Sequence, residues 1–242
     1  MGIPVVEAKN LTAGYGDKAI VRGMDLSIER GEVVALLGPN GSGKTTALLS
    51  LVGELPPLGG EVLWQGAVVR TPLHKRAQAG LAFVPEERSV LFGLSVLDNL
   101  RLGRGRIEDA FAIFPELEQM RHRRAGLLSG GEQQMLSLAR ALASKPQALL
   151  VDELSLGLAP IVVSRLLEAI ALAATQDGVA VLLVEQQARR AMQVAHRWYL
   201  LRQGVVIDSG TGAGGAHVLE EAYFSVVAPE SAAEADKEGP PR

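Results

Sequence analysis

A short glycine-rich stretch, Val33–Thr46, constrains this chain more than any other part of the sequence. An apolar segment leads into the turn GPNGSGKT (38–45), which fits the phosphate-binding pattern G-x-x-x-x-G-K-[ST], and a helical pattern follows. Glycine lets the backbone turn with positive φ, so N–H groups of the turn and of the helix start can converge on one anion. The stretch therefore predicts a phosphate-binding loop between a strand and a helix.

Two side chains of this loop suit the chemistry of a nucleoside triphosphate. Lys44 can reach the β- and γ-phosphates, and the Thr45 hydroxyl can ligate Mg²⁺. The residues expected to surround the phosphates are Gly38, Pro39, Asn40, Gly41, Ser42, Gly43, Lys44, Thr45 and Thr46.

Composition narrows the class of protein. The chain has 242 residues, 48% of them hydrophobic, which is enough for one sizeable core or two small ones. Its net charge of −3 gives no argument for binding nucleic acid or an anionic membrane, and the absence of cysteine excludes disulfides and thiolate metal sites. The N-terminus lacks a signal pattern, and the longest apolar run, 161–174, is interrupted by charged residues. We therefore expect a soluble protein, or one attached to a membrane only through a partner.

Strand patterns alternate with helix patterns along most of the chain, which predicts an α/β fold with a mostly parallel sheet. Residues 3–34 carry β patterns with Gly-containing turns, and the purely helical stretch 95–145 predicts an inserted subdomain. The expected strands are 5–6, 24–28, 32–37, 61–69, 80–84, 148–152, 179–184, 198–201 and 205–208, and the expected helices are 44–53, 72–79, 96–102, 107–114, 132–143, 159–176 and 189–196. One domain over 1–228, with the helical subdomain at about 90–145, should precede a disordered tail, 229–242.

Two adjacent acids, Asp152 and Glu153, end the apolar strand 148–152. The carboxyl ends of parallel strands line the ligand crevice of an open sheet. If this strand lies beside the P-loop strand, Asp152 can help to hold Mg²⁺ and Glu153 can act as general base toward an attacking water.

A second helix start, LSGGEQQ (128–134), also suits a phosphate. Ser129 and Glu132 fit the helix-capping pattern S-x-x-E, but capping does not explain Gly130 and Gly131, which lower helix propensity. Glycines at this place permit close approach of an anion to the helix N-terminus. Two such helix ends in one small chain suggest a nucleotide held between two copies.

The P-loop, LSGGEQQ and LLVDE, in this order and spacing, resemble the ATP-binding subunit of an ATP-binding cassette (ABC) transporter over about residues 3–228. The segments Val84–Glu86, Leu156–Pro160 and Val184–Gln186 are similar to the branched-chain amino acid importer subgroup, and this chain resembles the shorter of its two ATPase subunits. The resemblance implies an ABC-type P-loop NTPase core, with an N-terminal antiparallel β subdomain and the inserted helical subdomain.

The resemblance also implies roles for further residues. Tyr15 would stack on adenine, while Ser129, Gly130, Gly131 and Glu132 would meet the ATP bound to the opposite protomer. Glu86 stands where the family has a glutamine that touches Mg²⁺, and Gln186 stands where it has a switch histidine, so these two are expected near the metal and the γ-phosphate. Leu154 stands where a proline normally follows the catalytic Glu, which would loosen the turn at Glu153.

By this resemblance the chain hydrolyses ATP with Mg²⁺ to power import, most directly of branched-chain amino acids. Its partners would be membrane-spanning permease subunits, a second ATPase subunit (in a hetero- or homodimer) and, indirectly, a periplasmic or extracellular solute-binding protein, with no nucleic acid. It would lie at the cytoplasmic face of the plasma membrane, held there by the permeases. The alternatives are import of urea, short amides or other amino acids, a non-transport ABC ATPase acting on nucleic acid, and a nucleotide-binding module with little hydrolysis.

Overall fold

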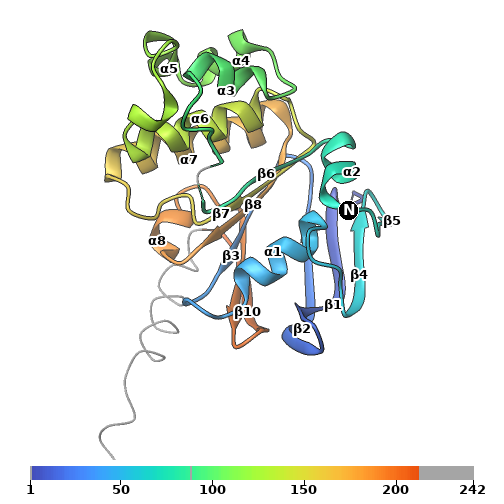
Figure 1. Ribbon diagram of the computed structural model, residues 1–242. Coiled ribbons are helices and arrows are strands. Elements are labelled where there is room, and N and C mark those ends of the chain that lie inside the picture. The colour runs from blue at the N-terminus through green and yellow to red at the C-terminus, as the bar shows by residue number, and fades with distance from the viewer. Residues whose placement is uncertain (1, 88, 213–242) are drawn as a thin grey trace, which may run out of the picture.

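The N-terminal part of the chain forms an antiparallel sheet (Figure 1). The computed structural model describes residues 2–87 and 89–212, so the expected tail, 229–242, and the predicted domain end at 228 lie outside the described residues. In spatial order the strands of this sheet are β2 (Lys18–Ile28), β1 (Val6–Tyr15), β4 (Gly59–Trp64) and β5 (Ala67–Val68). The single strand expected at 61–69 is wrong, because Gln65 and Gly66 both have positive φ and close a tight hairpin between β4 and β5.

The second sheet carries the P-loop strand and is parallel except at one edge. Its order is β10 (Val205–Thr211), β9 (Arg197–Arg202), β3 (Val33–Leu37), β8 (Ala180–Glu185), β7 (Ala148–Asp152) and β6 (Leu81–Val84). Every residue of β3, β7 and β8 is buried. Along β3, Ala35 packs into one apolar core and Leu36 into a second, so both faces of the sheet are covered. This explains why these strands are continuously apolar rather than alternating.

Helices cover the two faces of this sheet unequally (Figure 1). On the side of the N-terminal sheet lie α1 (Lys44–Val52) and α2 (Leu73–Gln78). The other side carries α6 (Gly130–Leu142) and α7 (Pro160–Asp177), with the inserted helical group α3 (Val96–Arg101), α4 (Ile107–Ile113), α5 (Pro115–Gln119) and η1 (Ala125–Leu127) above them. The expected insertion is present, although α5 and η1 were not predicted.

The last predicted helix, 189–196, is much shorter in the structure. Helix α8 spans only Ala188–Ala191. It ends early because His196 joins strand β3: its N–H donates to the Val33 carbonyl at 2.8 Å, and its Nδ1 accepts from the Val33 N–H at 3.0 Å. The chain must therefore leave the helix in time to begin β9.

The turn between β9 and β10 is hydrogen-bonded to the P-loop and holds it in place. The N–H of Gly204 donates to the Ser42 carbonyl at 2.9 Å, and the Gly204 carbonyl accepts from the Arg22 N–H at 2.8 Å. Gly204 has φ +80°, and a Cβ there would overlap the Ile20 carbonyl oxygen. Only glycine fits between β2 and the P-loop at this point.

Replacing Gly204 with Ala should therefore lower the free energy of unfolding by about 3 kcal/mol or more, since backbone strain and overlap add. Gly16→Ala is the matched control, because Gly16 also has positive φ (+56°) but open space around it. It should cost about 1–2 kcal/mol, the strain alone. Urea unfolding of both variants gives the comparison, and equal losses would contradict the supporting role of this turn.

Candidate nucleotide-binding and hydrolysis site

The P-loop joins β3 to α1 as the sequence predicts. Gly41 and Gly43 have φ of +76° and +105°, and α1 begins at Lys44 with no side chain capping it. The first N–H groups of a helix have no partner within the helix. The uncapped start of α1 thus presents backbone N–H groups and the positive end of the helix dipole to an anion.

Lys44 is held in the loop by oxygen atoms. Its side chain is only 4% exposed, and Nζ donates to the carbonyls of Gly38 at 2.9 Å and Pro39 at 3.2 Å. The same Nζ lies 3.2 Å from Oε1 of Glu153. The structure therefore brings together the predicted phosphate-binding lysine and the predicted general base, which lie far apart in the sequence.

A cavity of about 410 Å³ opens over the P-loop. Tyr15, at the end of β1, and Ile20, in β2, line one side, so the N-terminal sheet contributes an aromatic and an aliphatic surface. The lining residues are Tyr15, Ile20, Asn40, Gly41, Gly43, Lys44, Thr45, Thr46, Glu86, Glu153 and Leu156. Gly38, Pro39 and Ser42 shape the loop instead: the Ser42 N–H donates to the Pro39 carbonyl at 3.2 Å.

Asp152 ends β7 and is 2% exposed. The condition on which its role was predicted is wrong, because β8 lies between β7 and the P-loop strand β3. Asp152 still reaches the site, since the Thr45 side chain lies close enough to its carboxylate to lower its pKa. Burial raises the pKa of Asp152 to about 6, and the charges of Glu153 and Glu86 add to the rise, while Thr45 and Lys44 oppose it.

The site fits a hard divalent cation such as Mg²⁺. Oδ1 of Asp152 is buried and has no hydrogen-bond partner among the described residues, while the Thr45 hydroxyl lies beside the same carboxylate. Within 2–87 and 89–212 no three His, Cys, Asp or Glu side chains form a ready-made metal group. Mg²⁺ usually binds one or two protein oxygens together with phosphates and waters, and the side chains of Asp152 and Thr45 can supply such oxygens.

Glu153 and Gln186 follow neighbouring strands at the same edge of the sheet. Glu153 has φ +42°, a conformation that few residues other than glycine adopt, and its N–H donates to the Val184 carbonyl at 2.9 Å. Gln186 is half-buried and comes directly after β8. Because β8 separates β3 from β7, Gln186 leaves the sheet between the P-loop and Glu153.

The LSGGEQQ segment lies away from this cavity, since none of its residues lines it. Ser129 and Glu132 form the complete capping box at the start of α6: the Glu132 N–H donates to Ser129 Oγ at 3.3 Å, and the Ser129 N–H donates to Glu132 Oε2 at 2.7 Å. A Cβ on Gly131 would come within 2.8 Å of Val162 in α7. Close packing of α6 on α7 is thus a reason for this glycine that the sequence analysis did not include.

Three residues that shape the site were not singled out from the sequence. Ile20 lines the cavity, and Ser155 and Glu185 form a buried hydrogen-bonded pair beside Glu153 and Gln186. Of these three residues, only Glu185 could have been suspected from the sequence, because it lies next to Gln186. Its partner is 30 residues away in the chain, and sequence spacing does not reveal such a pair.

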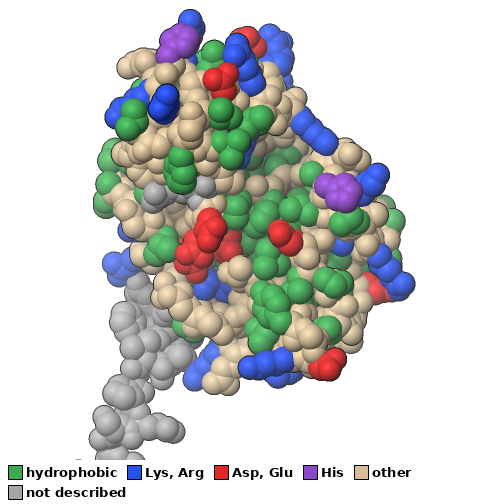
Figure 2. All heavy atoms as spheres, viewed as in Figure 1, with side chains coloured by type: hydrophobic (Ala, Val, Ile, Leu, Met, Phe, Trp, Pro, Cys, Tyr) green, Lys and Arg blue, Asp and Glu red, His purple; other side chains and the backbone are tan. Residues whose placement is uncertain are grey.

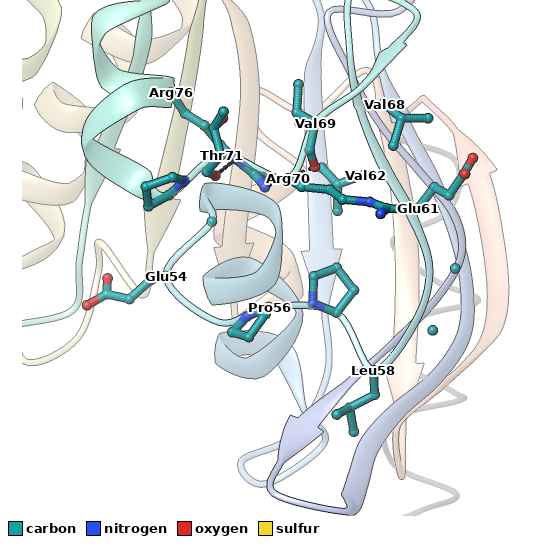
Figure 3. A pocket seen from close by; sticks show the side chains of 15 residues that line it. Glu54, Pro56, Leu58, Glu61, Val62, Val68, Val69, Arg70, Thr71 and Arg76 are labelled. Atoms are coloured by element: carbon teal, nitrogen blue, oxygen red, sulfur yellow. Dashed lines mark hydrogen bonds between the residues drawn. The ribbon is translucent and has the colours of Figure 1, made fainter.

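A second cavity, of about 600 Å³, lies between β4, β5 and α2 (Figure 3). Its one deeply buried cation, Arg76, already donates to the backbone carbonyls of Leu51 at 2.6 Å and Thr71 at 2.8 Å. The guanidinium is therefore used to join α1 to α2. It is not available to hold an anionic ligand.

The uncapped P-loop helix, the buried lysine and the convergent acids define a P-loop nucleotide-binding protein. Residues 21–155 match the model of the ABC transporter family, and the chain belongs to this family. It is an ATP-binding subunit of the ABC type, and the family hydrolyses ATP. None of the helices in 2–87 and 89–212 is long and apolar enough to cross a membrane.

Several known proteins are similar over most of the chain. The branched-chain amino acid transport ATP-binding protein BraG of Pseudomonas aeruginosa is 38% identical over 209 residues, covering 82% of this chain and 89% of BraG. The probable branched-chain amino acid transport ATP-binding protein LivF of Archaeoglobus fulgidus is 36% identical over 211 residues, covering 83% of this chain and 89% of LivF. The lipopolysaccharide export protein LptB of Escherichia coli is also 36% identical, with coverage of 84% and 89%.

A solved ATP-binding cassette, MJ0796, has the same fold. Its dimeric post-hydrolysis state bound to ADP and Pi matches with a TM-score of 0.76 and 25% identity, covering 85% of this chain and 98% of that one. The expected ABC-type architecture is thereby confirmed.

The buried carboxylate gives a pH-dependent prediction. Because the pKa of Asp152 is about 6 when folded and 3.8 ordinarily, the folded state binds the proton more tightly, and this stabilisation is lost as pH rises from about 4 to 6. In the presence of a chelator, the Asp152→Asn variant should therefore gain about 2.4 kcal/mol of stability over the wild type between pH 4 and pH 7. Chemical unfolding at several pH values measures the gain. A difference between Asp152→Asn and the wild type that does not change with pH would contradict the prediction.

Proposed function

We propose that this chain is the ATP-hydrolysing subunit of an importer, with Glu153 as the general base and Lys44 as the phosphate-binding cation. The observation that carries this proposal is their 3.2 Å ion pair beside the uncapped start of α1. A γ-phosphate bound at these N–H groups would compete for Lys44 and release the Glu153 carboxylate. Glu153 can then take a proton from water as the water oxygen attacks the γ-phosphorus and ADP leaves.

The remaining site residues divide into three roles. Thr45, Asp152 and Glu86 would hold Mg²⁺, which when bound neutralises charge on the β- and γ-phosphates. Gln186 would hydrogen-bond to the γ-phosphate without changing its own charge, since an amide does not titrate. Tyr15, which is 56% exposed at the cavity rim, would stack on the base.

We propose that a second protomer completes the site through Ser129, Gly130, Gly131 and Glu132. The separation of this segment from the cavity of its own chain supports an arrangement in trans. The capping box uses the Glu132 carboxylate, the Glu132 N–H and a lone pair of Ser129 Oγ, so the Ser129 hydroxyl proton and the N–H groups of Gly130 and Gly131 are left to meet a phosphate. The dimeric state of MJ0796 supports a dimer as the working form.

A surface groove of about 740 Å³ is the feature that supports the proposal of permease subunits as partners. Leu49, Leu73 and Phe83 line it with other apolar residues, while Glu54 and Glu87 add acidic groups. Figure 2 shows hydrophobic side chains gathered on this face, with acidic side chains beside them. Such a surface suits a cytoplasmic helix with an apolar face and basic ends. Docked there, the chain would lie at the cytoplasmic face of the plasma membrane and act indirectly with a solute-binding protein.

The proposed cargo is branched-chain amino acids, because BraG and LivF carry this description. Import of urea or short amides is the second candidate within the same role. LptB, with nearly the same identity, is named for lipopolysaccharide export, so similarity of the ATPase subunit constrains the cargo only weakly.

The test is the Glu153→Gln variant. Loss of the base should lower kcat for ATP hydrolysis by about 10²–10⁴-fold while ATP binding persists. The same variant should shift from monomer to dimer on adding Mg-ATP in size-exclusion chromatography with light scattering. Lys44→Ala is the control, since it should lose binding and dimerisation together.

Unchanged hydrolysis by Glu153→Gln would refute its role as base. Lost hydrolysis without a dimer would refute a homodimeric sandwich and favour pairing with a different ATPase subunit, which a mixture of the two subunits would then reveal.

A further inference from the structure

A buried carboxylate that the proposed mechanism does not use lies between the two catalytic segments. Glu185 ends β8, is 2% exposed and precedes Gln186. Both of its oxygens accept hydrogen bonds from Ser155, from the N–H at 3.1 Å and from the hydroxyl at 2.9 Å. Ser155 is itself buried and lies two residues after Glu153.

The same serine is bound from a third direction. Arg190, in the short helix α8, donates to the Ser155 carbonyl at 3.0 Å. The N–H, hydroxyl and carbonyl of Ser155 are thus all bound by the segment that begins with Glu185 and contains Gln186. Three hydrogen bonds that each involve a charged side chain restrict the serine from three directions, and bonds to charged groups are stronger than bonds between neutral ones.

The turn at Glu153 needs such support. Glu153 has φ +42°, which strains a residue with a side chain, and such a conformation persists only where its surroundings enforce it. The next residue is Leu154, which has no ring to fix its φ as proline would. Leu154 is 1% exposed, so its buried side chain and the buried Ser155 both anchor the turn that follows Glu153.

We propose that Glu185 and Arg190 are positioning residues for ATP hydrolysis, which hold Ser155 and thereby fix Glu153 and Gln186 in one relation to each other. This rests on the proposed role of Glu153. The two residues do not touch the phosphates in this scheme. They should therefore affect kcat much more than nucleotide affinity.

The first experiment is Glu185→Ala in the full chain. Misplacement of a catalytic group by about 1 Å can cost about 10²-fold in rate, so kcat should fall by roughly that factor while the Kd for ATP, titrated with a fluorescent analogue, stays within about twofold. Glu185→Gln should restore most of kcat, because the amide can accept from the Ser155 N–H and donate to its hydroxyl.

Glu32→Ala is the matched control for stability. Glu32 also binds an arginine, Arg197 at 2.6 Å, and a backbone N–H, that of Glu29 at 2.9 Å, but it lies just before β3, at the opposite end of the sheet. The Glu32→Ala variant should lower the free energy of unfolding while leaving kcat of the folded protein unchanged.

Arg190→Ala is the second variant, to be used if Glu185→Ala does not fold. It removes one hydrogen bond to Ser155, and kcat should then fall about tenfold.

Hydrogen exchange gives a readout that needs no turnover. The Ser155 N–H should exchange faster in Glu185→Ala than in the wild type, while the Glu153 N–H, bonded to Val184, should report any release of the neighbouring turn.

Two results would overturn the positioning role: a Glu185→Ala kcat equal to that of the wild type, or an equal loss of kcat in the Glu32→Ala control. Neither result would affect the proposed role of Glu153 as the general base, provided that the Glu153→Gln variant is inactive. Failure of the proposed function is distinct, since Glu153→Gln would then retain its activity.

Discussion

Strand β8 is the constraint on which the site depends. It lies between β3 and β7, all of its residues are buried, and its carboxyl end therefore opens between the P-loop and the acids of β7. This placement brings Gln186 out of the sheet between the strand that leads to the P-loop and the strand that leads to Glu153. It also lets Glu185 reach Ser155, so one strand end sets the geometry of both segments proposed to face the phosphates.

The charges at this edge are unbalanced in a way that suits a metal–nucleotide complex. Glu86, Asp152 and Glu153 converge near a single buried lysine, and their mutual repulsion adds to the raised pKa of Asp152. Burial likewise raises the pKa of Glu185, although two hydrogen bonds from Ser155 oppose the rise. A bound divalent cation would relieve the repulsion at Asp152, whereas Ser155 and Arg190 stabilise Glu185 within the protein.

Local features of the fold could be predicted because their causes are local. Helix α1 starts and stops at glycines, Gly43 and Gly53, and β7 spans the residues predicted for it, 148–152. The capping box of α6 follows from Ser129 and Glu132 alone. The misjudged elements had distant causes: α8 is short because His196 pairs with Val33, on a strand far back in the chain. The β4–β5 hairpin is an exception, since the Gln65–Gly66 turn is local and was overlooked.

The sequence by itself determined the chemistry: a P-loop lysine, a pair of acids after an apolar strand and a second glycine-containing helix start, because each depends on neighbouring residues. Tertiary structure alone decided how these parts meet. Strand order placed β8 between β3 and β7, close helix packing explained Gly131 against Val162, and a contact over 30 residues joined Ser155 to Glu185. Such pairings are set by burial of both faces of a sheet, a property of the whole chain that no short segment carries.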